Sequence, residues 1–264
     1  MTFSPDSYRD GEGLRWSKAR FLEMPLIRIL RLPSSTQVNL YTMNNAKSIV
    51  LNFVLMLVLL FAIPVCAQDS LRFQKEVNKL IAGDSTVNKK NLIIFTGSSS
   101  IRFWPDLNIY FPKHNILNRG FGGSEMIDLV NYVDKLILPY NPKQIFIYEG
   151  DNDINAGKNP DKILQEADRL LLLIRGKLSR KVQVVFISPK PSISREPLKD
   201  KYLAYNQKLR SWTKQKRNVA FIDVWTPMLD ADGNVRKDLF IGDGLHMNKK
   251  GYDIWAKVIG PYIK

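Results

Sequence analysis

The chain has 264 residues, of which 45% are hydrophobic and 24% are charged. This composition is that of a soluble globular protein with enough apolar residues for one good core. The formal net charge is +14, but the densest basic clusters, 199–201 and 214–217, lie in a segment with helical periodicity. This favours a solvated helix face over an anionic partner, and we expect no nucleic-acid partner.

A hydrophobic stretch over 49–63 precedes the other predicted elements. It is shorter than the about 20 residues that a membrane span needs, and its length suits the apolar core of a signal peptide. Met43 opens this segment and Lys47 gives it a positive flank. Cleavage after Ala67 would leave Gln68 as the mature N-terminus, so we expect an exported protein with no stable membrane span after cleavage.

These features predict three parts of the chain. We expect 1–42 to be an upstream extension that is not translated or is disordered, 43–67 to be the signal peptide, and 68–264 to be the functional domain. An uncleaved anchor and a lipid on Cys66 are the alternatives, although Val65 is a poor fit to the small residue that lipidation requires. Cys66 is the only cysteine, so the mature domain would contain no disulfide.

Strands and helices alternate along the predicted domain. Periodicity and turn residues predict helices over 71–81, 125–138, 160–177, 198–215 and 249–263. Apolar runs predict strands over 91–95, 116–117, 144–148, 182–187 and 219–223. Five strands separated by helices indicate an α/β fold with a mostly parallel, five-stranded sheet that is covered on both faces.

Polar and glycine-rich segments follow several of these strands. In parallel sheets, ligands bind outside the carboxyl ends of the strands. The segments concerned are Gly-Ser-Ser-Ser-Ile at 97–101, Asn-Arg-Gly-Phe-Gly-Gly at 118–123, Glu-Gly-Asp-Asn-Asp at 149–153 and Asp-Gly-Leu-His at 243–246. Each segment alone is ordinary loop chemistry, but the four contain every part that an acyl-transfer site needs.

A serine hydroxyl becomes a useful nucleophile when a base removes its proton, and imidazole is the natural base near neutral pH. The chain has two histidines. His114 lies in a polar loop and is expected at the surface. His246 follows Asp243 by three residues, a spacing that lets the carboxylate reach the imidazole ring and fix its tautomer. The 97–101 segment offers three adjacent serines.

An oxyanion on the substrate needs hydrogen-bond donors aimed at it. The backbone N–H of Gly123 and the side-chain amide of Asn152 are candidates, joined by the N–H of Ser99. The order serine, aspartate, histidine along the chain is one that known triads use.

The four segments resemble those of the SGNH hydrolases, also called GDSL-like lipases or acylhydrolases. The resemblance covers 90–264. It implies Ser99 as nucleophile, Asp243 and His246 as its partners, and Gly123 and Asn152 as oxyanion donors with Ser99. Segment 118–123 is similar to the platelet-activating-factor acetylhydrolase branch. The family implies a flavodoxin-like three-layer α/β/α sandwich with no metal and no organic cofactor.

The first segment departs from the family pattern. The family reads Gly-Asp-Ser-Leu, whereas this chain has Ser98 in the place of the aspartate. Ser99 is therefore chosen by its alignment to the family's Gly-x-Ser and not by local chemistry. Asp151, beside Asn152, is expected to add negative charge at the rim of the site.

We therefore expect a secreted serine esterase that removes acetyl or other short acyl groups from carbohydrate. The alternative enzyme is a lysophospholipase or a broad short-chain esterase. The alternative without catalysis is a glycan-binding module that keeps the fold. Trp104, Phe121 and Trp225 are interpreted as core residues, with a role in lining a pocket as the second reading. The substrate is a small-molecule or carbohydrate ester, and the oligomeric state stays open.

Overall fold

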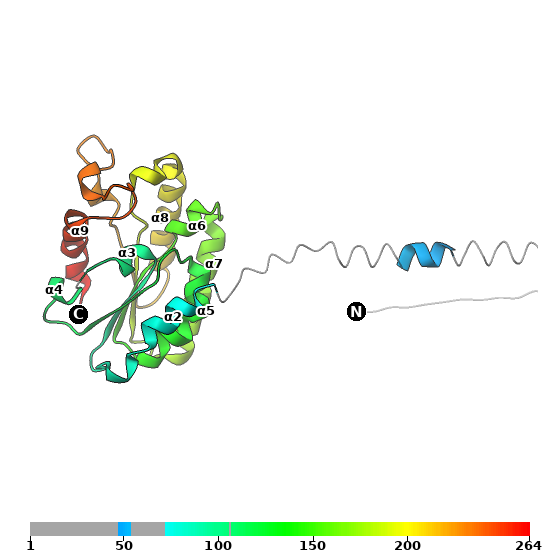
Figure 1. The fold of residues 1–264 in the computed structure, drawn as a ribbon, viewed down its shortest axis with the longest axis horizontal. Helices are drawn as coiled ribbons and strands as arrows, with labels where there is room; N and C mark the ends of the chain where they lie inside the picture. The colour runs from blue at the N-terminus through cyan, green and yellow to red at the C-terminus, as the bar shows by residue number, and fades with distance from the viewer. Residues whose placement is uncertain (1–46, 54–71, 106) are drawn as a thin grey trace, which may run out of the picture. The chain divides into compact units, whose positions relative to one another are not determined.

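The computed structural model describes residues 47–53, 72–105 and 107–264 (Figure 1). The chain divides into two units, Met1–Cys66 and Ala67–Lys264, and the second is compact. In the first unit, residues 47–53 are helical and exposed. The predicted upstream extension and the rest of the predicted signal peptide lie outside the described residues. Of the helices in the described ranges, none has the length and apolar content required to cross a membrane.

A five-stranded, all-parallel sheet forms the centre of the second unit. Its strands are β1 (Ile93–Gly97), β2 (Ile116–Gly120), β3 (Gln144–Tyr148), β4 (Gln183–Ile187) and β5 (Val219–Ile222). The strand order is β2-β1-β3-β4-β5, which is the flavodoxin-like order. The chain therefore reverses direction across the sheet between β1 and β3, and ligands bind at such a point in doubly wound folds.

Helices cover both faces of this sheet (Figure 1). The helices of the second unit are α2 (Gln74–Ile81), α3 (Ser99–Arg102), α4 (Leu107–Tyr110), α5 (Met126–Leu136), α6 (Asp151–Asn155), α7 (Pro160–Lys177), α8 (Lys199–Lys214) and α9 (Lys249–Ile259). Helices α2, α5, α7 and α8 pack in one hydrophobic core, and α3, α4 and α9 pack in the other. This is a three-layer α/β/α sandwich.

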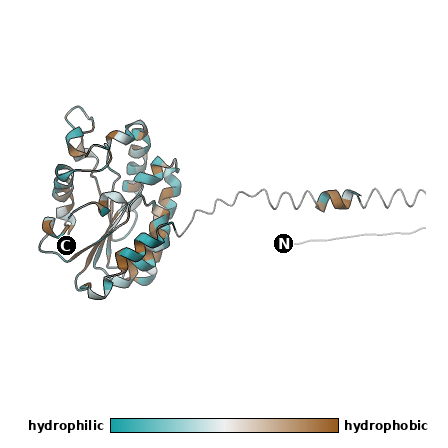
Figure 2. Cartoon of the chain, viewed as in Figure 1, coloured by the Kyte–Doolittle hydropathy of each residue, from teal (hydrophilic) through white to brown (hydrophobic). Residues whose placement is uncertain are grey.

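The strands supply both cores because successive side chains point to opposite faces of a sheet. In β3, Ile145 and Ile147 join the core under α5 and α7, whereas Phe146 and Tyr148 join the core under α9. A strand buried on both faces therefore appears in the sequence as a continuous apolar run. The helices carry hydrophilic and hydrophobic residues side by side (Figure 2), because one face of each meets a core and the other meets solvent.

Gly97 fixes the end of β1, immediately before the serine segment. Its φ is +131°, and a Cβ at this position would lie 2.0 Å from the carbonyl oxygen of Tyr148. The next residue, Ser98, donates its backbone N–H to the same carbonyl at 3.1 Å. Only glycine allows this close approach, so Gly97 sets the direction in which the chain enters α3.

Candidate active site

Ser99, His246 and Asp243 lie in a chain of hydrogen bonds at the carboxyl edge of the sheet. The His246 Nε2 atom lies 2.9 Å from Ser99 Oγ, and Nδ1 lies 2.6 Å from Asp243 Oδ2. With the Nδ1 proton donated to Asp243, Nε2 is left as the acceptor for the Ser99 hydroxyl. The structure thus brings together two segments that are 147 residues apart in sequence.

The loop before α9 holds Asp243 and His246 in place. Asp243 Oδ1 accepts the backbone N–H groups of Leu245 and His246, both at 2.9 Å. The carbonyl of His246 accepts the N–H of Ile241 at 2.9 Å. Asn248 caps α9, and its Nδ2 donates to the carbonyl of Phe240 at 3.2 Å. The three-residue spacing of Asp243 and His246 therefore forms a tight turn that directs both side chains toward Ser99.

Asp243 is an ionised carboxylate over the whole physiological pH range. Burial by itself would raise its pKa, but hydrogen bonds from the His246 ring and from the N–H groups of Leu245 and His246 lower the pKa to about 2. The ionised carboxylate keeps the proton on Nδ1 and stabilises the imidazolium that a proton transfer from Ser99 would produce.

Among the three adjacent serines, Ser99 is the one that contacts His246. Ser98 and Ser100 are buried, with 2% and 3% of their surface exposed, whereas Ser99 is partly exposed. The carbonyl of Ser100 accepts the hydroxyl of Tyr252 from α9 at 3.0 Å. Ser98 precedes the first turn of α3. The serine that replaces the family's aspartate therefore lies beside the reacting hydroxyl in sequence but outside the chain of contacts.

The predicted oxyanion donors lie in the segments that follow β1, β2 and β3. Ser99 is the first residue of α3, so its N–H has no acceptor within the helix. Gly123 adopts a φ of +78°, and within the part of the chain that the structure describes its N–H has no hydrogen-bond acceptor. Asn152 lies in α6 and uses one amide hydrogen on the carbonyl of Ser124 at 2.9 Å. A side-chain amide has two N–H donors, so the second is free.

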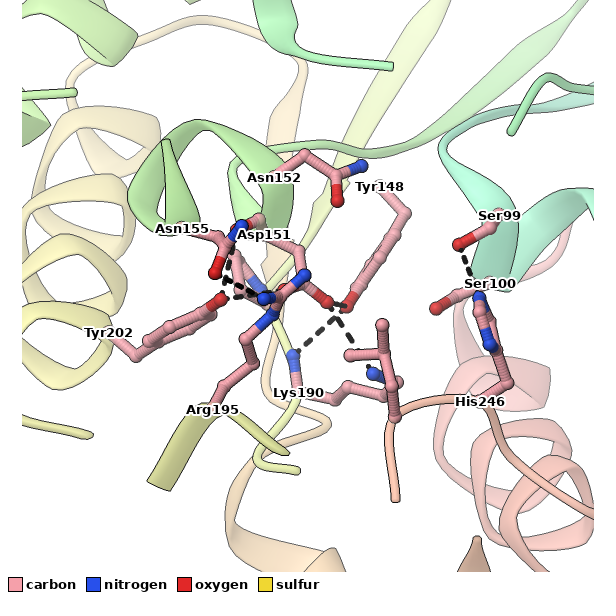
Figure 3. A network of polar contacts seen from close by, with 12 residues as sticks. Ser99, Ser100, Tyr148, Asp151, Asn152, Asn155, Lys190, Arg195, Tyr202 and His246 are labelled. Atoms are coloured by element: carbon pink, nitrogen blue, oxygen red, sulfur yellow. Dashed lines mark hydrogen bonds and ion pairs between the residues drawn. The ribbon is translucent and has the colours of Figure 1, made fainter. Parts of the chain in front are cut away.

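Asp151 corrects one expectation from the sequence. It does not add negative charge at the rim, because it is 4% exposed and forms an ion pair with Lys190, whose Nζ lies 3.4 Å from its Oδ2. Tyr148 and Tyr202 donate their hydroxyls to the two carboxylate oxygens at 2.8 and 2.7 Å (Figure 3). Burial would raise the pKa of Asp151, but Lys190 and the two hydroxyls outweigh it and lower the pKa.

Lys190 is a residue of this network that sequence reasoning missed. It follows β4 in the segment Ser-Pro-Lys-Pro-Ser, is 1% exposed, and has its ammonium 5.8 Å from the centre of the Phe240 ring. Burial lowers the pKa of Lys190, and Asp151 opposes this effect. A lysine between prolines is normally a surface residue, so no sequence pattern indicated its burial.

We expect Lys190→Met to destabilise the protein by about 3–5 kcal/mol, because it removes the nearer cation of the buried Asp151 and leaves only Arg195, whose Nε lies 3.9 Å from Oδ1. Urea denaturation followed by circular dichroism measures this free energy of unfolding. The double variant Lys190→Met with Asp151→Asn should lose less than the single variant. The control is Lys201→Met on the exposed face of α8, which should leave the midpoint unchanged. An unchanged midpoint in Lys190→Met would contradict the assigned pairing.

Phe103 is the aromatic side chain beside the site. Its ring meets the His246 ring edge to face with 5.1 Å between centroids, and 49% of its surface is exposed. Ile241, on the loop that carries His246, is 50% exposed. Trp104, Phe121 and Trp225, in contrast, are buried in the cores, as the sequence interpretation favoured. Exposed apolar surface therefore lies next to the imidazole.

His114 lies just before β2, at the amino edge of the sheet, and is partly exposed. It is thus separated from the loops that carry Ser99 and His246. In the described ranges, no cluster of three or more histidine, cysteine, aspartate or glutamate side chains is placed to hold a metal ion.

The family model for the GDSL-like Lipase/Acylhydrolase family matches residues 81–254. No curated protein matches the sequence. Among solved structures, the chain is similar to a candidate platelet activating factor from Streptococcus pneumonia, with a TM-score of 0.65, 20% identity, and coverage of 84% of this chain and 99% of the other.

Two further structures share the fold. A GDSL-like lipase from Bacteroides thetaiotaomicron matches with a TM-score of 0.62 and 19% identity over 74% of this chain and 98% of the other. A catalytic mutant of an acetylxylan esterase from Geobacillus stearothermophilus matches with a TM-score of 0.55 and 14% identity over 66% and 94%. The family model spans the strands and loops that carry Ser99, Gly123, Asn152 and His246. The chain therefore belongs to the GDSL-like lipase/acylhydrolase family and is an ester hydrolase.

Proposed function

We propose that this ester hydrolase is a serine carboxylesterase with Ser99 as nucleophile, His246 as general base and Asp243 as the carboxylate that orients the base. The observation that carries the proposal is the continuous contact from Ser99 Oγ to His246 Nε2 at 2.9 Å and from Nδ1 to Asp243 at 2.6 Å. These are hydrogen-bond distances between a nucleophile, its base and an orienting group.

In the first half of the reaction, Ser99 Oγ attacks the ester carbonyl while its proton passes to His246 Nε2. The carbonyl oxygen becomes an oxyanion, which accepts hydrogen bonds from the N–H groups of Ser99 and Gly123 and from the free amide hydrogen of Asn152. Collapse of this intermediate breaks the ester C–O bond. The imidazolium returns its proton to the departing alcohol, and an acyl group stays on Ser99.

In the second half, water replaces the alcohol. His246 accepts a proton from the water as its oxygen attacks the acyl carbonyl, and the same three donors hold the second oxyanion. Release of the carboxylic acid breaks the bond to Ser99, whose Oγ regains a proton from His246. The active site returns to its starting state with one ester bond hydrolysed and one water consumed.

The proposed substrate is an acetyl or other short acyl ester of a carbohydrate. The side chains of His246 and Asp243 are 23% and 43% exposed, and Phe103 presents an exposed ring beside them. Such an open site leaves room for a bulky polar alcohol, and a sugar ring can pack its apolar face on an aromatic ring. The acetylxylan esterase from Geobacillus stearothermophilus has the same fold, which supports this substrate class.

A substrate panel tests the proposal. We expect kcat/KM for an acetylated xylo-oligosaccharide to exceed that for a lysophosphatidylcholine by at least about tenfold, a difference of about 1.4 kcal/mol in transition-state binding. p-Nitrophenyl acetate and octanoate, assayed in parallel, give the preference for acyl length. Faster hydrolysis of the lysolipid would replace the carbohydrate proposal with the lysophospholipase alternative. Binding of sugars without hydrolysis of any ester would support the glycan-binding module.

We also propose that the enzyme is exported and cleaved after Ala67. The apolar run over 49–63 with Lys47 before it supports this proposal. Mass spectrometry of the mature protein should find Gln68 as its first residue. A peptide from residues 1–42 in the native precursor would contradict the expectation that these residues are not translated.

A further inference from the structure

Glu149 is a buried carboxyl group behind the proposed oxyanion donors. It follows β3 directly and is 1% exposed. Its Oε1 accepts the hydroxyl of Ser124 at 2.6 Å. Within the described residues, no lysine or arginine forms an ion pair with it, although Lys158 pairs with the nearby Asp153. Ionising a buried carboxyl group that has no cation beside it costs free energy. Such a residue next to the proposed donors suggests a function.

Ser124 links Glu149 to both loop donors. It is fully buried and follows Gly123 in sequence. Its carbonyl accepts one amide hydrogen of Asn152 at 2.9 Å. The orientation of Ser124 therefore determines where the second amide hydrogen of Asn152 points and also where the preceding peptide bonds direct the Gly123 N–H. The side chain of Ser124 is held by one contact, from its Oγ to Glu149 Oε1.

Backbone N–H groups on both sides of Gly123 and Ser124 already have acceptors. Phe121 donates to the carbonyl of Gly97 at 2.8 Å, and Gly122 donates to Glu76 at 3.0 Å. Met126 donates to Asp153 at 3.1 Å. The loop is thus anchored on both sides of Gly123, and between these anchors Ser124 contacts Glu149 and Asn152.

We propose that Glu149 is a positioning residue for the oxyanion hole, which it orders by holding Ser124 so that Asn152 and Gly123 direct their free N–H groups at the reacting carbonyl. This inference rests on the proposed function of Asn152 and Gly123 as oxyanion donors. Glu149 acts on the reaction through Ser124 and does not touch the substrate.

The direction of the pKa shift of Glu149 fits this role. Burial raises the pKa of Glu149 well above its usual range, and the charge of Asp153 raises it further. The neutral carboxyl still accepts the Ser124 hydroxyl through its carbonyl oxygen. The raised pKa favours this neutral form, which places no negative charge behind the oxyanion, whereas an ionised group there would oppose the developing charge.

Three variants test the proposal. Ser124→Ala removes the hydroxyl but keeps the backbone carbonyl, and Glu149→Leu removes the acceptor. Glu149→Gln keeps an acceptor oxygen of the same shape and cannot ionise. We expect Ser124→Ala and Glu149→Leu to lower kcat for p-nitrophenyl acetate about 10- to 100-fold with little change in KM, because donors that shift by about 1 Å lose this much. Glu149→Gln should retain most of the wild-type kcat.

Thr213→Val is the matched control, since it removes a buried hydroxyl that donates to the carbonyl of Arg210 in α8 at 2.9 Å. It should leave kcat unchanged. Combining Ser124→Ala with Glu149→Leu should cost no more than one of them alone, because both remove the same contact. An unchanged kcat in folded Ser124→Ala would overturn the proposal. A loss of kcat in Glu149→Gln as large as that in Ser124→Ala would also overturn it. This comparison can still be made if Glu149→Leu does not fold.

A second readout does not depend on turnover. The two side-chain amide protons of Asn152, assigned in ¹⁵N-labelled protein by comparison with Asn152→Ala, should have distinct chemical shifts in the wild type and in Glu149→Gln. In Ser124→Ala they should move toward the shifts of a free asparagine. Unchanged signals in Ser124→Ala would refute the positioning role. Absence of esterase activity in the wild type with these shifts intact would instead refute the proposed function alone.

Discussion

Ser99→Ala is expected to lower kcat for p-nitrophenyl acetate by about 10⁶-fold, or as far as the uncatalysed background allows the rate to be measured. The reason is that Ser99 Oγ is the serine hydroxyl in contact with His246 Nε2, and the covalent route is lost with it. KM for any residual hydrolysis should change little, because the substituted side chain is small and the donors of Gly123 and Asn152 remain.

Ser98 and Ser100 provide controls within the same segment. Both are buried, and neither hydroxyl contacts His246 in the described structure. Ser98→Ala and Ser100→Ala should therefore keep kcat within about threefold of the wild type, which is within the effect of a small buried change. If Ser98→Ala or Ser100→Ala abolished hydrolysis and Ser99→Ala did not, the nucleophile would be the neighbouring serine and not Ser99.

Asn152→Ala is expected to lower kcat about 10²- to 10³-fold, the usual effect of removing one oxyanion donor. The loss should fall on kcat and leave KM nearly unchanged, because the hydrogen bond forms to the oxyanion and not to the ground-state ester. Steady-state kinetics with p-nitrophenyl acetate separate the two constants.

Asn155→Ala is the matched control for this prediction. Asn155 also lies in α6, but its side chain accepts a hydrogen bond from Arg195 (Figure 3). Its kcat should equal that of the wild type. Equal losses in the two variants would mean that the effect comes from the helix and not from the amide of Asn152.

The sequence predicted the fold well where strands are buried on both faces. The prediction over 144–148 coincides with β3, because the run Gln-Ile-Phe-Ile-Tyr supplies both cores. The prediction over 116–117 was too short, since β2 continues to Gly120 through Asn118 and Arg119. Asn118 binds the carbonyl of Ile101 at 2.7 Å, and Arg119 pairs with Asp84. Long-range partners allow these polar residues in a strand, and no local pattern reveals such partners.

Short helices were the elements that the sequence did not predict. Helices α3, α4 and α6 have only four or five residues, which is too few for an apolar periodicity to be visible. Two of them carry site residues, Ser99 and Asn152. Their conformation depends on close packing, as at Gly120, where a Cβ would lie 2.3 Å from the backbone nitrogen of Arg102 in α3.

The sequence predicted the catalytic residues of the site better than the residues that surround them. Asp243 and His246 are close in sequence, so their spacing indicated a shared turn. Ser99 could be selected only by resemblance, because the contact with His246 that distinguishes it spans 147 residues. Phe103, Lys190 and Glu149 were missed because their exposure or burial is decided by tertiary packing. Their residue types would predict a core aromatic and two surface charges.

Labelling with a fluorophosphonate tests the identity of the nucleophile most directly, because this probe reacts covalently with an activated serine. The tryptic peptide that spans residues 91–102 contains all three candidate hydroxyls, and fragmentation in the mass spectrometer locates the adduct. We expect the label on Ser99 in the wild type and no label on this peptide in either Ser99→Ala or His246→Ala. A label that persists in Ser99→Ala, or that forms at full rate without the imidazole of His246, would contradict the account.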